Sequence, residues 1–285
     1  MNVNNYNGMK IVFWGEDAFS NVVLQSLISA NHNVQLVITP LYDNLRYKKL
    51  EYTCNANNIP LDRYKNINAK EVVEKVKSLD PDICVVAHFE RLIKKDLLSI
   101  PKLGFINLHP SLLPNYRGMS PQHWPIINGD IETGITVHYI DEGTDTGDII
   151  LQRKLVLNNN MYVSDLQKEW LNQYKTIIVE AIDCILSGAP VWQQRHCRGS
   201  YYGRLKPEQC KIEISQGIEA AYNLIRGVSM PYIGASFENF IIYRASIITK
   251  EKQSENVGKL IANGNGGYFL VFVDGVLKIE KYKTV

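Results

Sequence analysis

The chain has 285 residues, of which 45% are hydrophobic and 21% charged, and its formal net charge at neutral pH is +2. This length favours one large domain with a small appendage, and the composition is ordinary for a globular enzyme. No run of about 18 apolar residues occurs, so a transmembrane helix is excluded. A charge this close to zero gives no electrostatic argument for a nucleic-acid partner.

The polar start, MNVNNYNGMK, lacks the basic and apolar regions of a secretory signal, so we expect a cytoplasmic protein whose fold begins near Met9. The five cysteines form no Cys-x-x-Cys pair, and we expect reduced thiols with no disulfide frame and no metal site. The most basic stretch, RYKKL at residues 46–50, is typical of a solvated loop or of the start of a helix.

Buried strands alternate with amphipathic helices in the first part of the chain. Residues 10–15, KIVFWG, predict a strand, Asp17 can cap the helix that follows, and residues 34–39 predict a second strand. The same alternation predicts a helix over 72–79 and strands over 83–88 and 104–109. This order indicates a doubly wound parallel sheet, which binds ligands beyond the carboxyl ends of its strands. The first turn, GEDAFS, lacks G-x-G-x-x-G, which disfavours a nicotinamide enzyme.

Two strands, 134–141 and 148–155, are expected to form a hairpin around the loop EGTDTG. One long helix is predicted over 163–186, with Ser164 as N-cap and Gly188 as its stop. Beyond Pro190 an Arg-, Gly- and Tyr-rich segment precedes a helix at 216–228 and several short strands. We therefore predict a Rossmann-like α/β domain with a mostly parallel sheet over 9–190, a linker or binding segment over 191–210, and a small β-rich C-terminal module with one helix over 211–285.

The segment FINLHPSLLPNYRG, residues 105–118, places chemistry at the end of a strand. Asn107 and His109 share a face because side chains at i and i+2 of a strand point the same way. An Asn amide can donate a hydrogen bond to an oxyanion, and a His can exchange a proton near neutral pH. The pair suits attack on a carbonyl, although a polar pair satisfied within the fold is the alternative.

The loop DEGTDTGD supplies the carboxylate that this pair lacks, and Asp145 is our choice among its acids. A carboxylate near His109 would raise the imidazole pKa and could accept a proton through water. The same loop could instead be an ordinary hairpin turn or a calcium-like loop.

Residues 107–152, from NLHPSLLPNYRG to DTGDIILQ, resemble the signature block of the folate-dependent formyltransferases, and the start MKIVFWGEDAFSNVVLQSL is similar to the same family. The family includes methionyl-tRNA formyltransferase, glycinamide ribonucleotide transformylase and nucleotide-linked sugar N-formyltransferases. The resemblance covers roughly residues 9–190 and, more loosely, the C-terminal part. It implies formylation of a primary amine by N10-formyltetrahydrofolate.

The resemblance also implies residue roles. Asn107 and a protonated His109 would hold the tetrahedral oxyanion, and Asp145 would keep that imidazole charged and help remove the proton of the amine. The loops at 89–93 and 141–144 would hold the folate, although Leu92 could be ordinary core. The cofactor-binding candidates are Phe89, Arg91, Leu92, Ile93, Asp141, Glu142 and Thr144.

The acceptor amine is predicted from the C-terminal part. GSYYGRLKPEQCKIEIS and AAYNLIRGVSMPYIGASF resemble the sugar N-formyltransferases, and Tyr rings can stack on a base while Arg can hold a diphosphate. The substrate-binding candidates are Ser111, Tyr116, Arg117, Gly118, Tyr201, Tyr202, Arg204, Tyr222 and Arg226. For the Tyr and Arg residues of the C-terminal part, the alternative is an aromatic core of the small module with surface Arg partners.

We therefore expect a nucleotide-sugar partner, a dTDP-linked amino-dideoxy sugar such as dTDP-4-amino-4,6-dideoxyglucose, in O-antigen or surface-polysaccharide synthesis. No nucleic acid or membrane partner is expected, and a homodimer through the C-terminal part is an option. The alternatives are a methionyl-tRNA formyltransferase, which the near-neutral charge disfavours, and a non-catalytic folate- or nucleotide-binding protein.

Overall fold

The computed structural model describes residues 8–41, 47–194, 198–264 and 266–285. The chain forms two compact units that are discontinuous in sequence. The first unit comprises Met1–Arg117, Ile135–Arg153 and Trp170–Ser200, and the second comprises Gly118–Gly134, Lys154–Glu169 and Tyr201–Val285. The continuous boundaries at 190 and 210 stay a prediction.

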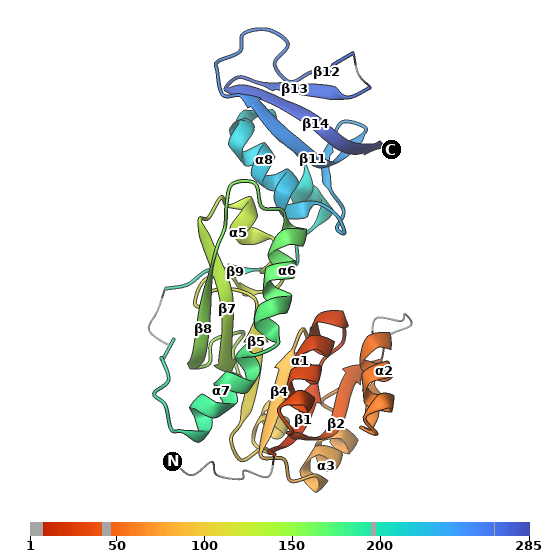
Figure 1. Cartoon of the computed structure of the whole chain (residues 1–285), viewed down its shortest axis with the longest axis vertical. Helices are drawn as coiled ribbons and strands as arrows, with labels where there is room; N and C mark the ends of the chain where they lie inside the picture. The colour runs from red at the N-terminus through yellow and green to blue at the C-terminus, as the bar shows by residue number, and fades with distance from the viewer. Residues whose placement is uncertain (1–7, 42–46, 195–197, 265) are drawn as a thin grey trace. The chain divides into compact units, whose positions relative to one another are not determined.

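A seven-stranded sheet with the order β3-β2-β1-β4-β5-β7-β8 organises the first unit (Figure 1). Its strands are β1 (Lys10–Trp14), β2 (Asn33–Pro40), β3 (Leu61–Tyr64), β4 (Ile83–Ala87), β5 (Phe105–His109), β7 (Glu132–Tyr139) and β8 (Ile149–Val156). The first five strands pair in parallel, and β7 pairs with β5 antiparallel. The predicted mostly parallel sheet is confirmed.

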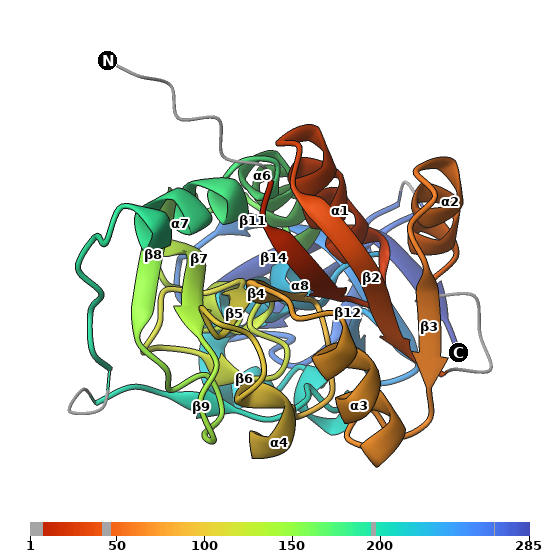
Figure 2. The ribbon, with the colours of Figure 1, turned by 90° about the horizontal axis from the view of Figure 1, so that it is seen from below.

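Helices cover both faces of this sheet, as Figure 2 shows for α1 (Ala18–Ser29) and α2 (Lys48–Ala56) on one face and α3 (Lys70–Ser78) and α4 (Lys95–Leu98) on the other. The helices cover both faces because apolar strand residues point to both sides of the sheet. Val12, Trp14, Leu36 and Ile38 are buried in one cluster with Val72 and Val76 of α3, while the intervening Ile11, Phe13 and Val37 are fully buried as well. The strands are therefore apolar on both faces, which is typical of a sheet covered on both sides.

The predicted N-cap of α1 agrees with the structure, whereas the helix bounds predicted further along the chain do not. The Asp17 side chain accepts hydrogen bonds from the backbone N–H groups of Phe19 and Ser20, so the predicted cap is confirmed. The single helix predicted over 163–186 is wrong, because the structure has α6 (Val163–Tyr174) and α7 (Ile177–Leu186). The chain leaves the helical conformation at Thr176, where φ is −131°, and Ser164 lies inside α6 rather than at its cap.

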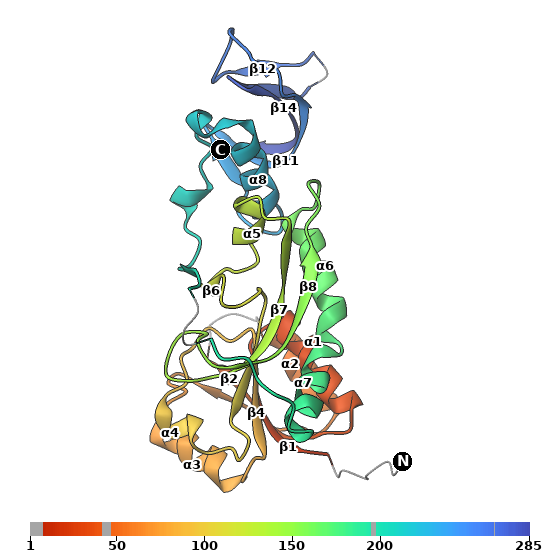
Figure 3. The same cartoon turned by 90° about the vertical axis from the view of Figure 1, so that its left-hand side faces the viewer.

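The second unit contains a five-stranded antiparallel sheet with the order β10-β11-β14-β13-β12 (Figure 3). Its elements are α5 (Trp124–Ile127), α8 (Gly217–Val228), β10 (Ala235–Phe237), β11 (Phe240–Thr249), β12 (Leu260–Ala262), β13 (Tyr268–Phe272) and β14 (Gly275–Thr284). The apolar face of α8 is buried with strand residues such as Ile242, Phe272 and Leu277. The predicted β-rich module is confirmed.

Short elements complete the described chain: β6 (Arg117–Gly118), β9 (Tyr201–Tyr202), and the 3-10 helices at Pro207–Cys210 and Ile214–Gln216. The described cysteines, Cys54, Cys84, Cys184 and Cys210, are free thiols, and Cys197 lies outside the described residues. Across the segments that the structure describes, no helix combines the length and apolarity needed to cross a bilayer.

Candidate active site

Asn107, His109 and Asp145 come together in the first unit. Asn107 and His109 lie on β5 at the carboxyl edge of the parallel strands, and Asp145 lies in the loop between β7 and β8. The Nδ1 atom of His109 is 3.7 Å from the Asp145 carboxylate, and both side chains are largely buried. The three residues that the sequence analysis named as catalytic candidates are therefore spatial neighbours.

His109 presents one nitrogen to the site. Its Nε2–H donates to the carbonyl oxygen of Tyr116 at 2.8 Å, so the neutral ring carries its lone pair at Nδ1, toward Asp145. Burial lowers the pKa of His109, and this effect outweighs the Asp145 carboxylate and the Tyr116 carbonyl, which both raise it. This direction favours a neutral imidazole that can accept a proton at Nδ1, and the protonated His109 that the family resemblance implies stays a prediction.

His138, which sequence reasoning missed, fixes the amide of Asn107. The two residues are opposite each other in the β5–β7 ladder, and Asn107 Nδ2 lies 3.2 Å from His138 Nε2. His138 Nδ1–H donates to the Tyr139 carbonyl at 2.7 Å, so Nε2 is the acceptor for one N–H of the Asn107 amide. The other N–H is left to donate to a reacting oxygen.

His138 Nε2 also lies 3.6 Å from the second carboxylate oxygen of Asp145. Two imidazoles therefore flank a single carboxylate. Within the described residues, no group of three His, Cys, Asp or Glu side chains is arranged to hold a metal ion.

A clamp holds the Asp145 loop from the backbone side. Arg117 Nε donates to the Asp145 carbonyl at 3.1 Å and Arg117 Nη2 to Gln194 Oε1 at 2.9 Å, while Gln194 Nε2 donates to the Gly147 carbonyl at 2.6 Å. Asp145 adopts a φ of +53°, and a Cβ on Gly147 would lie 1.9 Å from the Tyr139 carbonyl oxygen. Arg117 thus holds the loop that carries Asp145, and its predicted contact with substrate stays a prediction. Gln194, also missed, carries no sequence signal.

The stiff loop after β5 shapes the site through its backbone. Ser111 is fully buried and donates its hydroxyl to the Asn115 carbonyl at 2.8 Å. Tyr116 has a φ of +62°, and its N–H donates to Ser200 Oγ at 2.8 Å. These contacts hold the loop whose Tyr116 carbonyl orients His109, and the predicted contacts of both residues with substrate stay predictions.

An ion pair links α4, which follows the first loop predicted for the folate, to the second of these loops. Lys95 at the start of α4 lies 3.5 Å from the Glu142 carboxylate. Asp141 is occupied within its own loop, where its carboxylate accepts hydrogen bonds from the Gly143 N–H at 3.0 Å and the Thr146 hydroxyl at 2.6 Å. The structure thus brings the two segments together and shows that Asp141 shapes its loop. The neighbouring Thr144 is half-buried.

Apolar side chains in the first of these loops differ in burial. Phe89 contacts Trp14 edge-on at 5.8 Å, and Ile93 belongs to the core cluster. Leu92 is 71% exposed, so the alternative that it is ordinary core is wrong. Its carbonyl accepts a hydrogen bond from Asn68 at 2.8 Å, and the adjacent Arg91 is exposed. An exposed Leu beside a half-buried Phe offers apolar surface to a flat ring.

The other predicted substrate residues belong to the second unit, whereas the trio belongs to the first. Tyr201 is 64% exposed, Arg204 is exposed, and Tyr202 stacks on Trp124 with ring centres 4.6 Å apart. At Gly118, where φ is +91°, a Cβ would lie 2.4 Å from the Tyr202 carbonyl oxygen.

Tyr222 and Arg226 are core residues of that unit. The Arg226 guanidinium is 5% exposed and donates to the Met161 carbonyl at 2.9 Å and to Asn223. It also lies 5.1 Å from the centre of the Tyr222 ring. The buried Tyr222 agrees with the alternative of an aromatic core, but the Arg226 that partners it is buried and not a surface residue.

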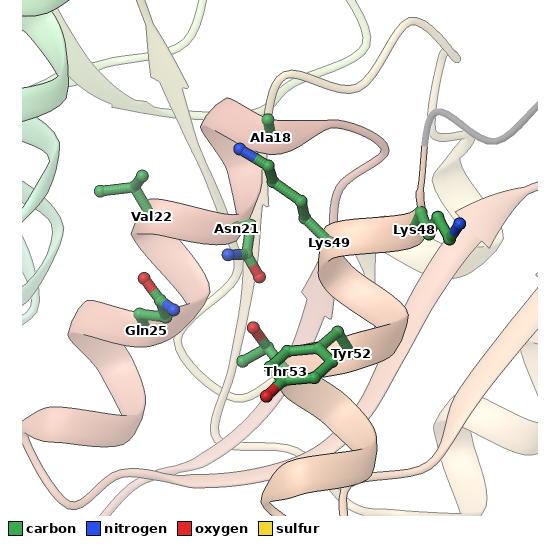
Figure 4. A pocket seen from close by; sticks show the side chains of 8 residues that line it. All are labelled: Ala18, Asn21, Val22, Gln25, Lys48, Lys49, Tyr52 and Thr53. Carbon is green, nitrogen blue, oxygen red and sulfur yellow. The ribbon is translucent and has the colours of Figure 1, made fainter.

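A hollow of about 530 Å³ lies between α1 and α2, and its lining includes none of Asn107, His109 and Asp145. Figure 4 shows Lys49 extending over Asn21 toward Ala18, with Tyr52 below. Lys48 and Lys49 are exposed, and among the described residues neither lies within ion-pair distance of a carboxylate. In the basic stretch RYKKL, Lys48 is the first residue of α2, so of the two predicted alternatives the start of a helix is confirmed. Arg46 lies outside the described residues.

An amide donor, imidazoles and a carboxylate lie together at the carboxyl edge of a doubly wound α/β sheet, where enzymes of this fold class bind their ligands, and these are groups that can move protons at a carbonyl centre. Comparison with protein families makes this class specific. The Formyl transferase family matches residues 9–182, and the family described as Formyl transferase, C-terminal domain, matches residues 204–284. The chain belongs to the formyl transferase family.

Individual relatives are similar over nearly the whole chain. The methionyl-tRNA formyltransferase of Clostridioides difficile is 36% identical, covering 96% of this chain and 91% of its own length. Among solved structures, the sugar 3N-formyl transferase WlaRD, crystallised in the presence of dTDP and 5-N-formyl-THF, is 22% identical with a TM-score of 0.74 over 96% of this chain and 97% of its own. The N-formyltransferase of Helicobacter canadensis, in complex with folinic acid and dTDP-3-aminofucose, is 22% identical with a TM-score of 0.72, covering 96% and 100%.

Proposed function

We propose that this protein transfers the formyl group of N10-formyltetrahydrofolate to a primary amine, with Asn107, His109 and Asp145 as its catalytic residues. The observation that carries the proposal is the position of the His109 Nδ1 lone pair, which faces the Asp145 carboxylate at 3.7 Å on the strand that also presents the Asn107 amide. The intact trio also disfavours a non-catalytic binding protein.

The chemistry follows from the protonation states. The amine nitrogen attacks the formyl carbon, and the Asn107 N–H that His138 leaves available donates to the carbonyl oxygen as it gains charge. His109 takes the proton of the amine at Nδ1, and the Asp145 carboxylate stabilises the imidazolium. The bond from the formyl carbon to N10 then breaks, and the proton passes to N10. The products are the formamide and tetrahydrofolate.

The loops at residues 89–93 and 141–144 are suited to hold the folate. The Lys95–Glu142 pair ties the second loop to the helix that follows the first, and Phe89 and exposed Leu92 offer the apolar surface that a flat pterin needs. The backbone groups of Arg91, Ile93 and Thr144 complete the predicted set. This assignment explains an exposed leucine that the packing of the core does not.

For the acceptor we propose the amino group of methionyl-tRNA in place of the amino sugar that the sequence suggested. The support is the 36% identity to a methionyl-tRNA formyltransferase over 96% of this chain, whereas the solved sugar enzymes, at 22% identity, share the fold. Net charge is a weak argument against RNA, since phosphate contacts depend on local cations. Exposed Lys48 and Lys49, which lack acidic partners among the described residues, are such cations.

A dTDP-linked amino sugar is the second candidate. Tyr201, 64% exposed at the start of the C-terminal part, could stack on a nucleotide base. The net charge of +2 suits a small acceptor as well as a large one.

A direct assay separates the two acceptors. The protein is incubated with N10-formyltetrahydrofolate and, in parallel, with methionyl-tRNA or a panel of dTDP- and UDP-linked amino sugars, and product masses are read. We expect methionyl-tRNA to gain 28 Da, about the mass of CO, at a rate at least about 100-fold above that of any sugar, a difference of roughly 2.7 kcal/mol. Formylated sugars with unmodified tRNA would restore the amino-sugar prediction.

A further inference from the structure

Two side chains from elsewhere in the first unit hold the loop at residues 89–93, which is proposed above to bind the folate. Glu16 approaches this loop from the end of β1, and Asn68 approaches it from the start of α3. Each forms hydrogen bonds with backbone groups of the loop or of Lys94, the residue that follows it. The steps of formyl transfer proposed above use neither side chain.

Glu16 holds the first half of the loop. The residue is only 2% exposed, and its carboxyl atom Oε1 accepts the backbone N–H of Glu90 at 2.7 Å. On the same strand end, the Trp14 ring contacts the Phe89 ring edge-on, with centres 5.8 Å apart. A hydrogen bond that is shielded from water is costly to lose, because the buried donor then has no partner. The end of β1 therefore fixes the backbone at Phe89 and Glu90.

Asn68 bridges the second half of the loop. Its Nδ2–H donates to the Leu92 carbonyl at 2.8 Å, and its Oδ1 accepts the Lys94 N–H at 2.8 Å. Because one side-chain amide both donates and accepts, the two bonds together fix the direction of the peptide groups between Leu92 and Lys94. The N–H of Asn68 donates to the Asn66 side chain at 3.1 Å, which helps to orient Asn68 itself.

The positions of both side chains are set by the hydrophobic core. Asn68 lies just before α3, whose Val72 is buried in the same cluster as Trp14 of β1 and Ile93 of the loop. Close packing in such a cluster leaves little freedom for the segments that share it. Glu16 and Asn68 are therefore held at a fixed place relative to the loop.

The two side chains leave other backbone groups of the loop open. Among the residues that the structure describes, the N–H groups of Leu92 and Ile93 form no hydrogen bond. Ile93 is only 7% exposed, and peptide groups of buried residues normally have a partner. Backbone donors that are fixed in direction and lack an internal partner are suited to the polar edge of a bound heterocycle.

We propose that Glu16 and Asn68 are positioning residues for the folate, which hold the backbone of residues 90–94 in the conformation that binds it. The inference rests on the folate site proposed above. A loop that is already ordered loses little conformational entropy on binding, so preorganisation raises affinity. Both residues act through the loop backbone and not on the reacting atoms. Their loss should therefore weaken cofactor binding more than it slows the chemical step.

The test measures binding of 5-formyltetrahydrofolate by isothermal titration calorimetry. Glu16→Ala and Asn68→Ala should each raise Kd by about tenfold, the change expected for the loss of one hydrogen bond of ordinary strength. Glu16→Gln keeps a side-chain oxygen for the Glu90 N–H and should restore Kd to within about twofold of wild type. Asn57→Ala is the matched control, since Asn57 Nδ2 donates to the Thr53 carbonyl at 2.8 Å at the end of α2. It loses the same kind of bond outside the loop, and its Kd should stay unchanged.

Steady-state kinetics separate positioning from a purely structural role. In both alanine variants, KM for N10-formyltetrahydrofolate should rise about tenfold, with small changes in kcat and in KM for the acceptor. Amide hydrogen exchange should become faster at residues 90–94. A lower kcat or Tm without a selective rise in the cofactor KM would assign a structural role and overturn the proposal.

The remaining outcomes distinguish this inference from the proposed function. An unchanged Kd in either folded alanine variant would overturn the role of that residue, and if Glu16→Ala does not fold, the half-buried Asn68 decides. If the wild-type protein binds 5-formyltetrahydrofolate and transfers formyl groups while the variants bind equally well, only the positioning role is refuted. A wild-type protein that does not bind 5-formyltetrahydrofolate would refute the folate site and this inference together.

Discussion

Asn107 and His138 face each other across the β5–β7 ladder, with the amide nitrogen of Asn107 3.2 Å from Nε2 of His138. The Tyr139 carbonyl fixes the tautomer of His138 by accepting its Nδ1–H at 2.7 Å. The orientation of the Asn107 amide is therefore set by a residue that lies outside the segment FINLHPSLLPNYRG, residues 105–118.

Replacing His138 should weaken catalysis through Asn107. In His138→Ala the amide loses its acceptor and can rotate, so we expect kcat to fall about tenfold to a hundredfold, with a smaller change in KM. His138→Gln, whose side chain can supply an amide oxygen, should recover part of the loss. Steady-state kinetics with circular dichroism to verify folding would check this; equal kcat in wild type and His138→Ala would remove the positioning role.

The pH dependence of kcat/KM should have an acidic limb set by His109. Because burial holds its pKa below the usual value near 6.5, the neutral base is present above that pH and is lost as the pH falls through the folded-state pKa. Asp145 raises this pKa, so Asp145→Asn should shift the limb to still lower pH and also reduce kcat strongly. Profiles between pH 5 and 8 would test the sign, and a shift to higher pH would contradict it.

The Arg117–Gln194 clamp should act as one unit. Arg117→Ala and Gln194→Ala each release the loop backbone around Asp145, and we expect kcat to fall about tenfold or more in each. In the double variant the loss should be clearly smaller than the product of the single losses, because the two residues share partners. Strictly multiplicative effects would mean that the residues act separately.

Cations on α2 should contribute to binding of a polyanionic acceptor. Lys48→Glu with Lys49→Glu should raise KM for methionyl-tRNA and flatten the dependence of log kcat/KM on log salt, as expected for lost phosphate contacts. Lys75→Glu with Lys77→Glu is the matched control, since these exposed lysines lie on α3 on the opposite face of the sheet. If the two double variants changed KM and the salt dependence equally, the effect would come from net charge alone.

Local patterns predicted the features that depend on neighbouring residues. The apolar strands, the Asp17 cap and the shared face of Asn107 and His109 follow from sequence spacing, and residue types were enough to select Asp145. His138 depends on the register between β5 and β7, and Gln194 reaches Arg117 from 77 residues further along the chain. Neither the contact of His138 with Asn107 nor that of Gln194 with Arg117 produces a periodic pattern in the sequence.

The charge state of the His109 imidazole also could not be predicted from the sequence. The pattern showed that a carboxylate accompanies His109, but the balance between burial and that carboxylate required the three-dimensional surroundings. The break between α6 and α7 is a similar case, since the apolar periodicity of residues 163–186 continues through it.

Single-turnover transfer from N10-formyltetrahydrofolate to methionyl-tRNA, with Asn107→Ala, His109→Ala and the control His32→Gln beside the wild-type protein, tests the central claim most directly. We predict that each of the first two substitutions slows transfer by at least about 100-fold, since losing one oxyanion donor costs on the order of 3 kcal/mol. Melting temperatures should stay close to wild type, and His32→Gln should be fully active. Transfer at the wild-type rate by a folded His109→Ala protein would contradict the account.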